Sequence, residues 1–400
     1  IVSNLVAQNK EITLEEIWSG NFSQDRLQSL QSLNNGQSYI VQDYNRAKGE
    51  MRVDIFEYKT GEKTGELINS SKIEGLNFFQ TFSLSQDETK AILGVQIEPI
   101  YRRSVKGQYF VYNIKTNNLT QIDVDKIQEP HFSPDNSQVA FVKNNNVFIK
   151  NIDNNTTTQV TADGQKNKII NGLTDWVYEE EFAFVKGFEW SPDGKYLAYL
   201  KFNESEVPEF SMDEYGTYGN NLYPKQDVFK YPKAGEKNAE VSLHIYNVKS
   251  DRSTEINLGD YHYIPRLKWS QKNNLLSAQT TNRHQNELKL HLVNTDNFSV
   301  ETILTATDKA YVDVDDDLTF LEDNSFIWTS EQDGWNHIYH YSENGKLINQ
   351  VTDGNWEVTN YYGYDSKTKR IFYQSTETGS VNRAVYSIKI NGKSKTTLAD

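Results

Sequence analysis

Trp190-Ser191-Pro192-Asp193-Gly194, followed at once by Tyr196-Leu197-Ala198-Tyr199, is the stretch of sequence that decides the fold. In such a turn the proline fixes φ, the aspartate side chain accepts hydrogen bonds from the turn, and the glycine accepts a positive φ. The residues after the turn have the period-2 pattern of a strand. The segment therefore predicts a tight turn that leads into a β-strand.

The same arrangement returns along the whole chain. An aromatic or apolar residue, a polar turn and an apolar strand begin at seven places, which are Leu30, Phe82, Phe132, Trp190, Trp269, Phe320 and Tyr364. Second strands such as Asn146–Ile149 and Ser242–Tyr246, a polar hairpin and a closing strand follow. Four-stranded units that recur about every 50 residues are typical of β-propeller blades. We therefore predict an all-β propeller with seven visible blades, and we assign no chemistry to the repeat itself.

Composition supports this prediction and excludes several functions. The 400 residues include 24 Tyr, 19 Phe and 7 Trp but only 2 Met, which suits many half-buried strands. The net charge of −14 argues against binding to nucleic acids and to anionic membrane surfaces, and it is compatible with cationic ligands. The chain has no cysteine, so disulfides, thiolate metal sites and cysteine nucleophiles are excluded. No apolar run is long enough to span a bilayer.

A second informative stretch is Asp175-Trp176-Val177-Tyr178-Glu179-Glu180-Glu181-Phe182. Three adjacent carboxylates repel one another, so their natural partner is a cation from elsewhere. A primary ammonium, such as a free peptide N-terminus, has three donors and a full positive charge. A glutamate run is also typical of the solvated face of a short helix. The large apolar residues around the glutamates favour a segment that is buried at its flanks and fixed in direction.

Here the sequence resembles a known family. The segment 174–181, the turn 190–194, Glu206-Val207-Pro208 and Tyr231-Pro232-Lys233-Ala234-Gly235 are similar to dipeptidyl peptidase IV, of the prolyl oligopeptidase family of serine peptidases. The similarity runs from about residue 10 to the end. It implies that Glu180 and Glu181 hold the N-terminal ammonium of a substrate peptide.

The resemblance also implies a role for Arg102, in Tyr101-Arg102-Arg103-Ser104. The family's arginine at this place hydrogen-bonds a carbonyl of the bound peptide, and the spacing to the strand that follows favours Arg102 over Arg103. A fixed cation near two carboxylates would also keep both ionised. From the sequence alone, a basic pair on a surface loop is an equally good interpretation.

The domain organisation follows from these observations. Residues 1–7 are compatible with the end of a signal peptide, and residues 8–400 form the propeller. Two intervals depart from the repeat: 165–187, which carries the glutamates, and 203–238, which the resemblance identifies as an arm that reaches a second subunit in a homodimer. A disordered surface loop is the alternative for the arm. The family's propeller has eight blades, so an eighth blade and a catalytic α/β-hydrolase domain are expected beyond residue 400.

The resulting functional prediction is the propeller part of an exported serine exopeptidase, periplasmic or extracellular. It would admit peptides with a free N-terminus and position them for release of an N-terminal dipeptide, Xaa-Pro or Xaa-Ala. No Gly-x-Ser-x-Gly nucleophile motif occurs in the chain, so these residues alone are expected to be inactive. Two alternatives remain: a tripeptidyl variant of the same family, and a non-catalytic propeller that binds peptides or mediates assembly.

Metal and cofactor sites are not expected. On a strand, His337 and His340 would point to opposite faces and could not share a metal ion. Asp313-Val314-Asp315-Asp316-Asp317 lacks the glycine and the terminal glutamate of an EF-hand, and we interpret it as an acidic loop at the rim. No phosphate-binding glycine loop is present.

Overall fold

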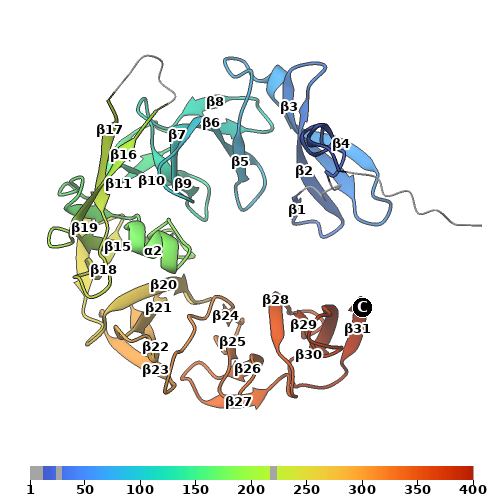
Figure 1. The fold of residues 1–400 in the computed structure, drawn as a ribbon, viewed down its shortest axis with the longest axis vertical. Coiled ribbons are helices and arrows are strands. Elements are labelled where there is room, and N and C mark those ends of the chain that lie inside the picture. Colours follow the sequence, from blue (N-terminus) through green and yellow to red (C-terminus); the bar gives the residue numbers. More distant parts are fainter. Residues whose placement is uncertain (1–11, 24–28, 217–222, 400) are drawn as a thin grey trace, which may run out of the picture. The chain divides into compact units, whose positions relative to one another are not determined.

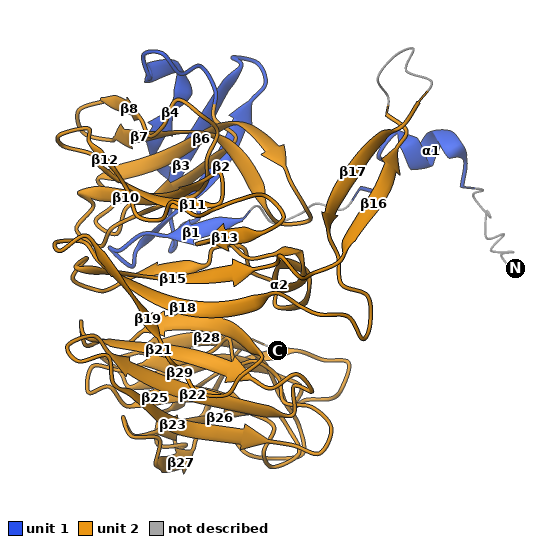
Figure 2. Cartoon of the chain, turned by 90° about the vertical axis from the view of Figure 1, so that its left-hand side faces the viewer, with its two compact units in different colours: residues 1–78 blue, residues 79–400 orange. Residues whose placement is uncertain are grey.

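The structure is a computed structural model and describes residues 12–23, 29–216 and 223–399. The signal-peptide-like residues 1–7 lie outside the described residues. The chain divides into two compact units, residues 1–78 and residues 79–400 (Figure 2). The first unit contains one four-stranded antiparallel sheet, and the second contains five more, one five-stranded sheet and a two-stranded hairpin.

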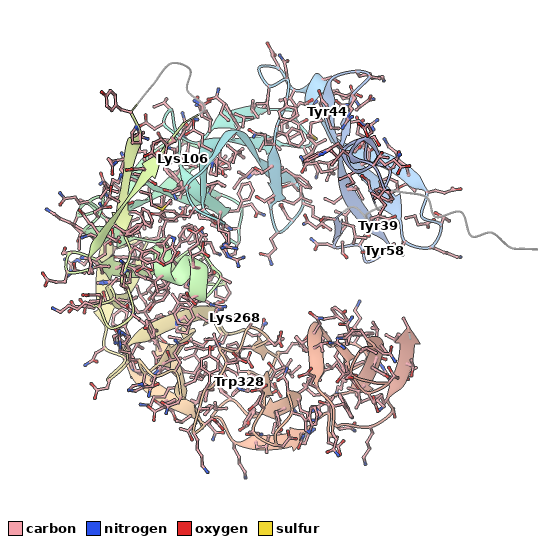
Figure 3. The ribbon with its side chains drawn as sticks, in the orientation of Figure 1. Tyr39, Tyr44, Tyr58, Lys106, Lys268 and Trp328 are labelled. Atoms are coloured by element: carbon pink, nitrogen blue, oxygen red, sulfur yellow. The ribbon has the colours of Figure 1, made fainter. Side chains whose placement is uncertain are left out.

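The first unit contains one blade, a short helix α1 (Leu14–Trp18) and a 3-10 turn η1 (Ser70–Lys72). Its strands are β1 (Leu30–Ser32), β2 (Ser38–Asn45), β3 (Glu50–Glu57) and β4 (Lys63–Asn69). Tyr39 and Tyr58 lie side by side at one end of this blade, with ring centroids 4.8 Å apart (Figure 3).

The second unit contains six blades (Figure 1). Blades two and three comprise β5 (Thr81–Leu84), β6 (Lys90–Pro99), β7 (Val105–Asn113) and β8 (Leu119–Gln121), then β9 (Gln128–Phe132), β10 (Gln138–Lys143), β11 (Asn146–Asn151) and β12 (Thr157–Gln159). Blade four comprises β13 (Ile169–Asn171), β14 (Phe188–Trp190), β15 (Tyr196–Asn203), β18 (Glu240–Asn247) and β19 (Arg252–Ile256). Blade five comprises β20 (Tyr263–Trp269), β21 (Leu275–Thr281), β22 (Glu287–Asn294) and β23 (Val300–Thr307). Blades six and seven comprise β24 (Thr319–Phe320), β25 (Phe326–Ser330), β26 (His337–Tyr341) and β27 (Leu347–Gln350), then β28 (Val358–Asp365), β29 (Arg370–Ser375), β30 (Ala384–Lys389) and β31 (Thr396–Ala399).

The predicted propeller with seven visible blades is confirmed. Each of the seven repeat starts falls at the first strand of one blade, and the polar turn after it leads into the second strand. In blade four the Ser191 hydroxyl donates to Asp193 at 2.9 Å, and Gly194 adopts a φ of +67°. The turn chemistry read from the sequence therefore forms the hairpins that begin the blades.

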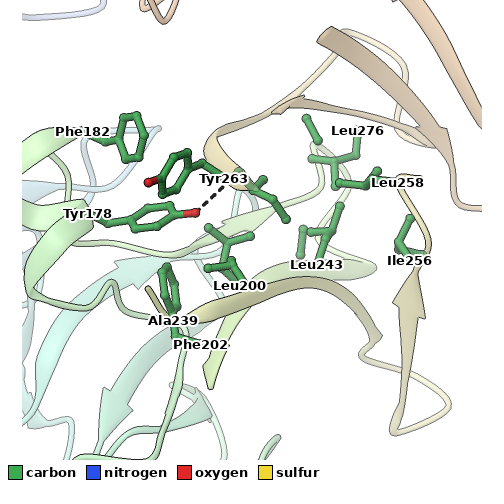
Figure 4. Close-up of a cluster of buried hydrophobic side chains, with 14 of the residues drawn as sticks. Tyr178, Phe182, Leu200, Phe202, Ala239, Leu243, Ile256, Leu258, Tyr263 and Leu276 are labelled. Carbon is green, nitrogen blue, oxygen red and sulfur yellow. Dashed lines mark hydrogen bonds between the residues drawn. The ribbon is translucent and has the colours of Figure 1, made fainter. Parts of the chain in front are cut away.

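Neighbouring blades of the second unit are held together by apolar clusters. In one of them, Leu200 of β15 and Leu243 of β18 pack with Leu276 of β21, so that blades four and five share a core (Figure 4). Similar clusters join blades two and three, three and four, five and six, and six and seven. Burial of these side chains between sheets is the main force that holds successive blades together.

Two segments leave the regular blade pattern, and both belong to blade four. One is a six-residue helix, α2 (Trp176–Glu181), between β13 and β14. The other is a hairpin of β16 (Glu209–Glu214) and β17 (Lys225–Lys230), which extends away from β15 and β18 (Figure 2). The predicted departures 165–187 and 203–238 contain these two segments, and the second one contains a paired hairpin where a disordered loop was the alternative.

The acidic loop 313–317 is not simply a rim loop as the sequence suggested. Asp315 is only 5% exposed, and it accepts hydrogen bonds from the backbone N–H groups of Leu318 and Thr329, at 2.6 Å each. Its carboxylate therefore organises the entry into blade six. On β26, His337 and His340 make separate hydrogen bonds, His337 with Thr352 and His340 with Ser325.

Within the described ranges, no group of three or more histidine, aspartate or glutamate residues is arranged to hold a metal ion. No helix in the described part of the chain is long and apolar enough to cross a membrane.

Candidate functional site

The helix α2 is carried on an interruption in the first strand of blade four. Both β13 and β14 pair with β15, β13 opposite Lys201–Asn203 and β14 opposite Leu197–Tyr199. Residues 172–187 leave the sheet between these two short strands. The two ends of this excursion are joined, because the Gly187 N–H donates to the Gly172 carbonyl at 3.0 Å. The helix is therefore presented on a closed loop while the blade keeps its hydrogen-bonded ladder.

Gly172 is required at the base of this loop. Its φ of +73° is in the left-handed region, where residues with a side chain are strained. A Cβ atom built on it would lie 2.6 Å from a methyl group of Val147 in the adjacent blade. The close approach of two blades therefore depends on a residue without a side chain at this position.

Local sequence explains why α2 forms and how it is fixed. Asp175 is the N-cap, and its side chain accepts a hydrogen bond from the Tyr178 N–H at 2.9 Å. Tyr178 is 1% exposed, and its hydroxyl accepts a hydrogen bond from the Ile264 N–H of β20 at 3.0 Å (Figure 4). One buried side chain thus ties the helix to blade five.

The arm contacts the same helix on another side. Trp176 packs against Tyr231, which directly follows β17, with ring centroids 4.4 Å apart. It also packs against Phe229 of β17, with ring centroids 6.4 Å apart. Phe229 also contacts Tyr101, which precedes Arg102, with ring centroids 6.0 Å apart. The aromatic residues near the glutamates therefore pack between the helix, the arm and the β6–β7 loop of blade two. The sequence predicted that they would bury the flanks of this segment.

Glu179 joins the helix to the loop between β6 and β7. Its side chain is 1% exposed, and its Oε1 accepts hydrogen bonds from the backbone N–H groups of Arg103 at 2.6 Å and Ser104 at 2.8 Å. A buried carboxylate with two such donors is well satisfied. The first glutamate of the triplet is thus a structural brace whose hydrogen bonds fix the backbone next to Arg102.

The three predicted site residues lie on the two segments that this brace joins. The Nε of Arg102 lies 2.8 Å from Oε2 and 3.2 Å from Oε1 of Glu180. The Arg102 side chain is 72% exposed and that of Glu180 is 17% exposed. Glu181 follows at the end of α2 and is exposed to solvent. The structure therefore brings Arg102 and Glu180 into contact, with Glu181 beside them on the helix.

Two buried acidic groups of this region, Asp175 and Glu204, have raised pKa values. Burial raises the pKa of Asp175 to about 6, although the Tyr178 N–H stabilises its ionised form. Burial, with a contribution from the charge of Asp175, raises the pKa of Glu204 to about 7. Burial and the charge of Glu204 raise the pKa of Tyr101 to about 12. Burial thus disfavours the ionised forms of Asp175 and Glu204, the N-cap of α2 and a buried acid whose pKa it influences.

Sequence reasoning named Arg102, Glu180 and Glu181 but missed the brace made by Glu179. The only local signal for it is that a glutamate follows the buried Tyr178, which does not identify its backbone partners in another blade. It also missed a cavity of about 400 Å³ whose wall includes residues 183–189, directly after α2. Glu180 and Glu181 are not part of that wall.

These features define a class of protein: a β-propeller that presents a short acidic helix on blade four, paired with an arginine of blade two. Residues 85–400 match the family model of the dipeptidyl peptidase IV (DPP IV) N-terminal region. The chain belongs to this family.

Relatives and solved structures agree with this assignment. The chain is 32% identical to dipeptidyl peptidase 4 of Trichophyton rubrum, over 75% of this chain and 40% of the relative. It is 25% identical to a probable dipeptidyl-aminopeptidase B of Pyrenophora teres f. teres, over 98% of this chain and 48% of the relative. The crystal structure of Porphyromonas gingivalis dipeptidyl peptidase 4 matches with a TM-score of 0.90 and 37% identity, over 98% of this chain and 56% of that chain. The chain thus spans about half the length, or less, of these curated relatives.

Proposed function

We propose that this chain is the substrate-positioning propeller of a serine exopeptidase that releases N-terminal dipeptides, Xaa-Pro or Xaa-Ala, from peptides. The observation that carries the proposal is the pairing of Arg102 with Glu180 on a helix that is braced from three sides. The names of the relatives, which are dipeptidyl peptidases, give the type of reaction.

In this proposal Glu180 and Glu181 bind the free ammonium of the peptide, and Arg102 donates to a backbone carbonyl. The ammonium has three donors, and two adjacent carboxylates can accept them. Arg102 pairs with Glu180 and fixes its carboxylate before the peptide arrives. Holding the first residues in this way places one peptide bond next to a nucleophile, which increases the effective concentration of the reacting groups.

The propeller would also act as a gate for the peptides that reach the helix. The catalytic serine, aspartate and histidine would belong to an α/β-hydrolase domain of the same polypeptide. We further propose a homodimer in which the arm contacts the second subunit, because Met212 and Tyr215 of the arm are 48% and 78% exposed. Export to the periplasm or the extracellular space rests on the signal-peptide-like residues 1–7.

The test uses the natural full-length protein and a glycyl-prolyl chromogenic substrate beside its N-acetylated twin. Only the free-amine form should be cleaved. The variants Glu180→Ala and Glu181→Ala should each lower kcat/KM by about 2–4 kcal/mol of transition-state stabilisation, because a desolvated ammonium loses a charged partner. Glu301→Ala is the matched control, since Glu301 is an exposed glutamate of β23 in blade five.

Equal cleavage of both twins would refute the role of the glutamates. Cleavage of tripeptide but not dipeptide substrates would favour the tripeptidyl alternative. Absence of any cleavage would favour the non-catalytic propeller.

A further inference from the structure

A cavity of about 400 Å³ begins where the helix α2 ends. Its wall includes Ala183, two residues after Glu181, and Arg103, the residue after Arg102. The wall of the cavity therefore begins within two residues of both segments that carry the proposed peptide-binding residues. Apolar side chains such as Phe184, Phe188 and Leu267 form much of the rest of the wall.

Irregular strands surround this cavity on both sides. In β9 the register shifts between Ala140 and Val142 of β10, so that Glu129 and Pro130 together stand opposite one residue. Glu129 has a φ of +48°, a left-handed conformation that is costly for a residue with a side chain. Bulges of this kind commonly redirect a side chain next to a functional site.

A second register shift lies across the cavity in β20, between Tyr263 and Arg266, at Pro265. Pro265 and Arg266 belong to the wall, as does Glu129. Between the two shifted strands lies the interrupted first strand of blade four. The first strands of blades three, four and five are thus all irregular around one cavity. This coincidence favours a ligand-binding site over a packing defect.

The charged side chains in the wall differ in whether they have an ion-pair or hydrogen-bond partner. Lys186 pairs with Glu189 at 2.8 Å, and Arg266 pairs with Asp316. Within the described residues, the partly buried carboxylate of Glu129 makes no hydrogen bond and no ion pair. Burial raises its pKa, and the charge of Lys186 opposes this effect. The guanidinium of Arg103, also in the wall, belongs to an exposed residue and is screened by water.

A half-buried carboxylate without donors is unfavourable, and a ligand with a cationic group would relieve it. The remaining wall is apolar and suits the methylene stem of such a side chain. We propose that this cavity receives the side chain of the first residue of a bound peptide, and that Glu129 makes the cavity selective for lysine or arginine at that position. This inference rests on the proposed function, because the peptide must be held at Glu180 and Glu181.

The test compares Gly-Pro, norleucyl-Pro and Lys-Pro chromogenic substrates on the natural full-length protein and on Glu129→Gln. Norleucine has a side chain similar to the lysine stem but no charge. In the unchanged protein Lys-Pro should be preferred over norleucyl-Pro, and Glu129→Gln should reduce that preference in kcat/KM by about tenfold or more. Cleavage of Gly-Pro should change less than about twofold, which also shows that the variant is folded.

An equal preference in Glu129→Gln and the unchanged protein would overturn this inference alone, because Gly-Pro would still be cleaved. A preference for norleucyl-Pro in the unchanged protein would overturn it as well. Equal cleavage of Gly-Pro and its N-acetylated twin, or no cleavage of any substrate, would overturn the proposed function and this inference with it.

Discussion

Replacing Glu179 by alanine should separate the helix α2 from the loop that carries Arg102. The two backbone N–H groups that donate to Glu179, from Arg103 and Ser104, would lose their acceptor. Glu179 is 1% exposed and Ser104 is 4% exposed, so water cannot easily replace the carboxylate. Hydrogen bonds to a charged group contribute about 1.5–3 kcal/mol each, and we expect a total loss of roughly 3–5 kcal/mol.

Thermal unfolding and kinetics measure the two consequences. The unfolding midpoint should fall on the order of 5 °C. For a free-amine dipeptidyl substrate, KM should rise, because Arg102 and Glu180 are no longer held in register. Glu179→Gln should be milder, since the amide oxygen can still accept both hydrogen bonds, without the charge. Glu301→Ala, at an exposed position of β23, is the control and should change neither quantity.

A Glu179→Ala variant with normal stability and normal KM would refute this reasoning. A variant that is less stable but has an unchanged KM would show that Glu179 braces the fold without positioning the site. Recovery of KM in Glu179→Gln, beside its loss in Glu179→Ala, would separate the positioning role from a purely structural one.

Three further predictions concern the same region. Tyr178→Phe removes the acceptor for the buried Ile264 N–H and should lower the free energy of unfolding by about 1–3 kcal/mol, measured by chemical denaturation. Gly172→Ala should destabilise by about 1–3 kcal/mol, because of its φ and its contact with Val147, whereas Gly259→Ala, with a similar φ and open space, should cost less. Because the folded-state pKa of Glu204 is raised from 4.5 to about 7, its contribution to stability is present below pH 4.5 and is lost as the pH rises through 7. Glu204→Gln should remove that part of the pH dependence of the thermal midpoint, and an identical dependence in the variant would contradict the raised pKa.

The blades could be predicted from sequence because their determinants are local. A turn such as 190–194 contains the proline, the aspartate and the glycine that it needs, and its strand partners are the next residues along the chain. The same reasoning located the two departures, because a segment without the repeat must leave the blade. It did not predict that β13 and β14 would share β15 as a partner, since the pairing of three-residue strands has almost no sequence pattern.

The candidate site, unlike the blades, depends on contacts between residues that are distant in the sequence. Arg102, Glu180 and Glu181 were identified through the resemblance. Residues alone left a solvated helix face as the alternative for the glutamates and a basic pair on a surface loop as an equally good interpretation for Arg102. The brace made by Glu179 spans 75 positions of sequence to Ser104, and its partners are backbone groups that every residue possesses. Glu129 was missed as well, because a β-bulge is determined by how two strands pair and not by the residue that occupies it.

The site therefore depends on separate structural features, which support the loop of blade four and connect it to blade two. Blade four keeps its ladder because β15 supplies partners to both halves of the interrupted strand, so the loop 172–187 can carry a helix at little cost to the sheet. The helix alone would not fix Arg102, which belongs to blade two. Glu179 makes that connection, and the ion pair between the exposed Arg102 and the partly buried Glu180 then needs little strength of its own. Ion pairs at the surface contribute only about 0–1 kcal/mol. Stability is provided by the buried first glutamate, which leaves the other two available for a ligand.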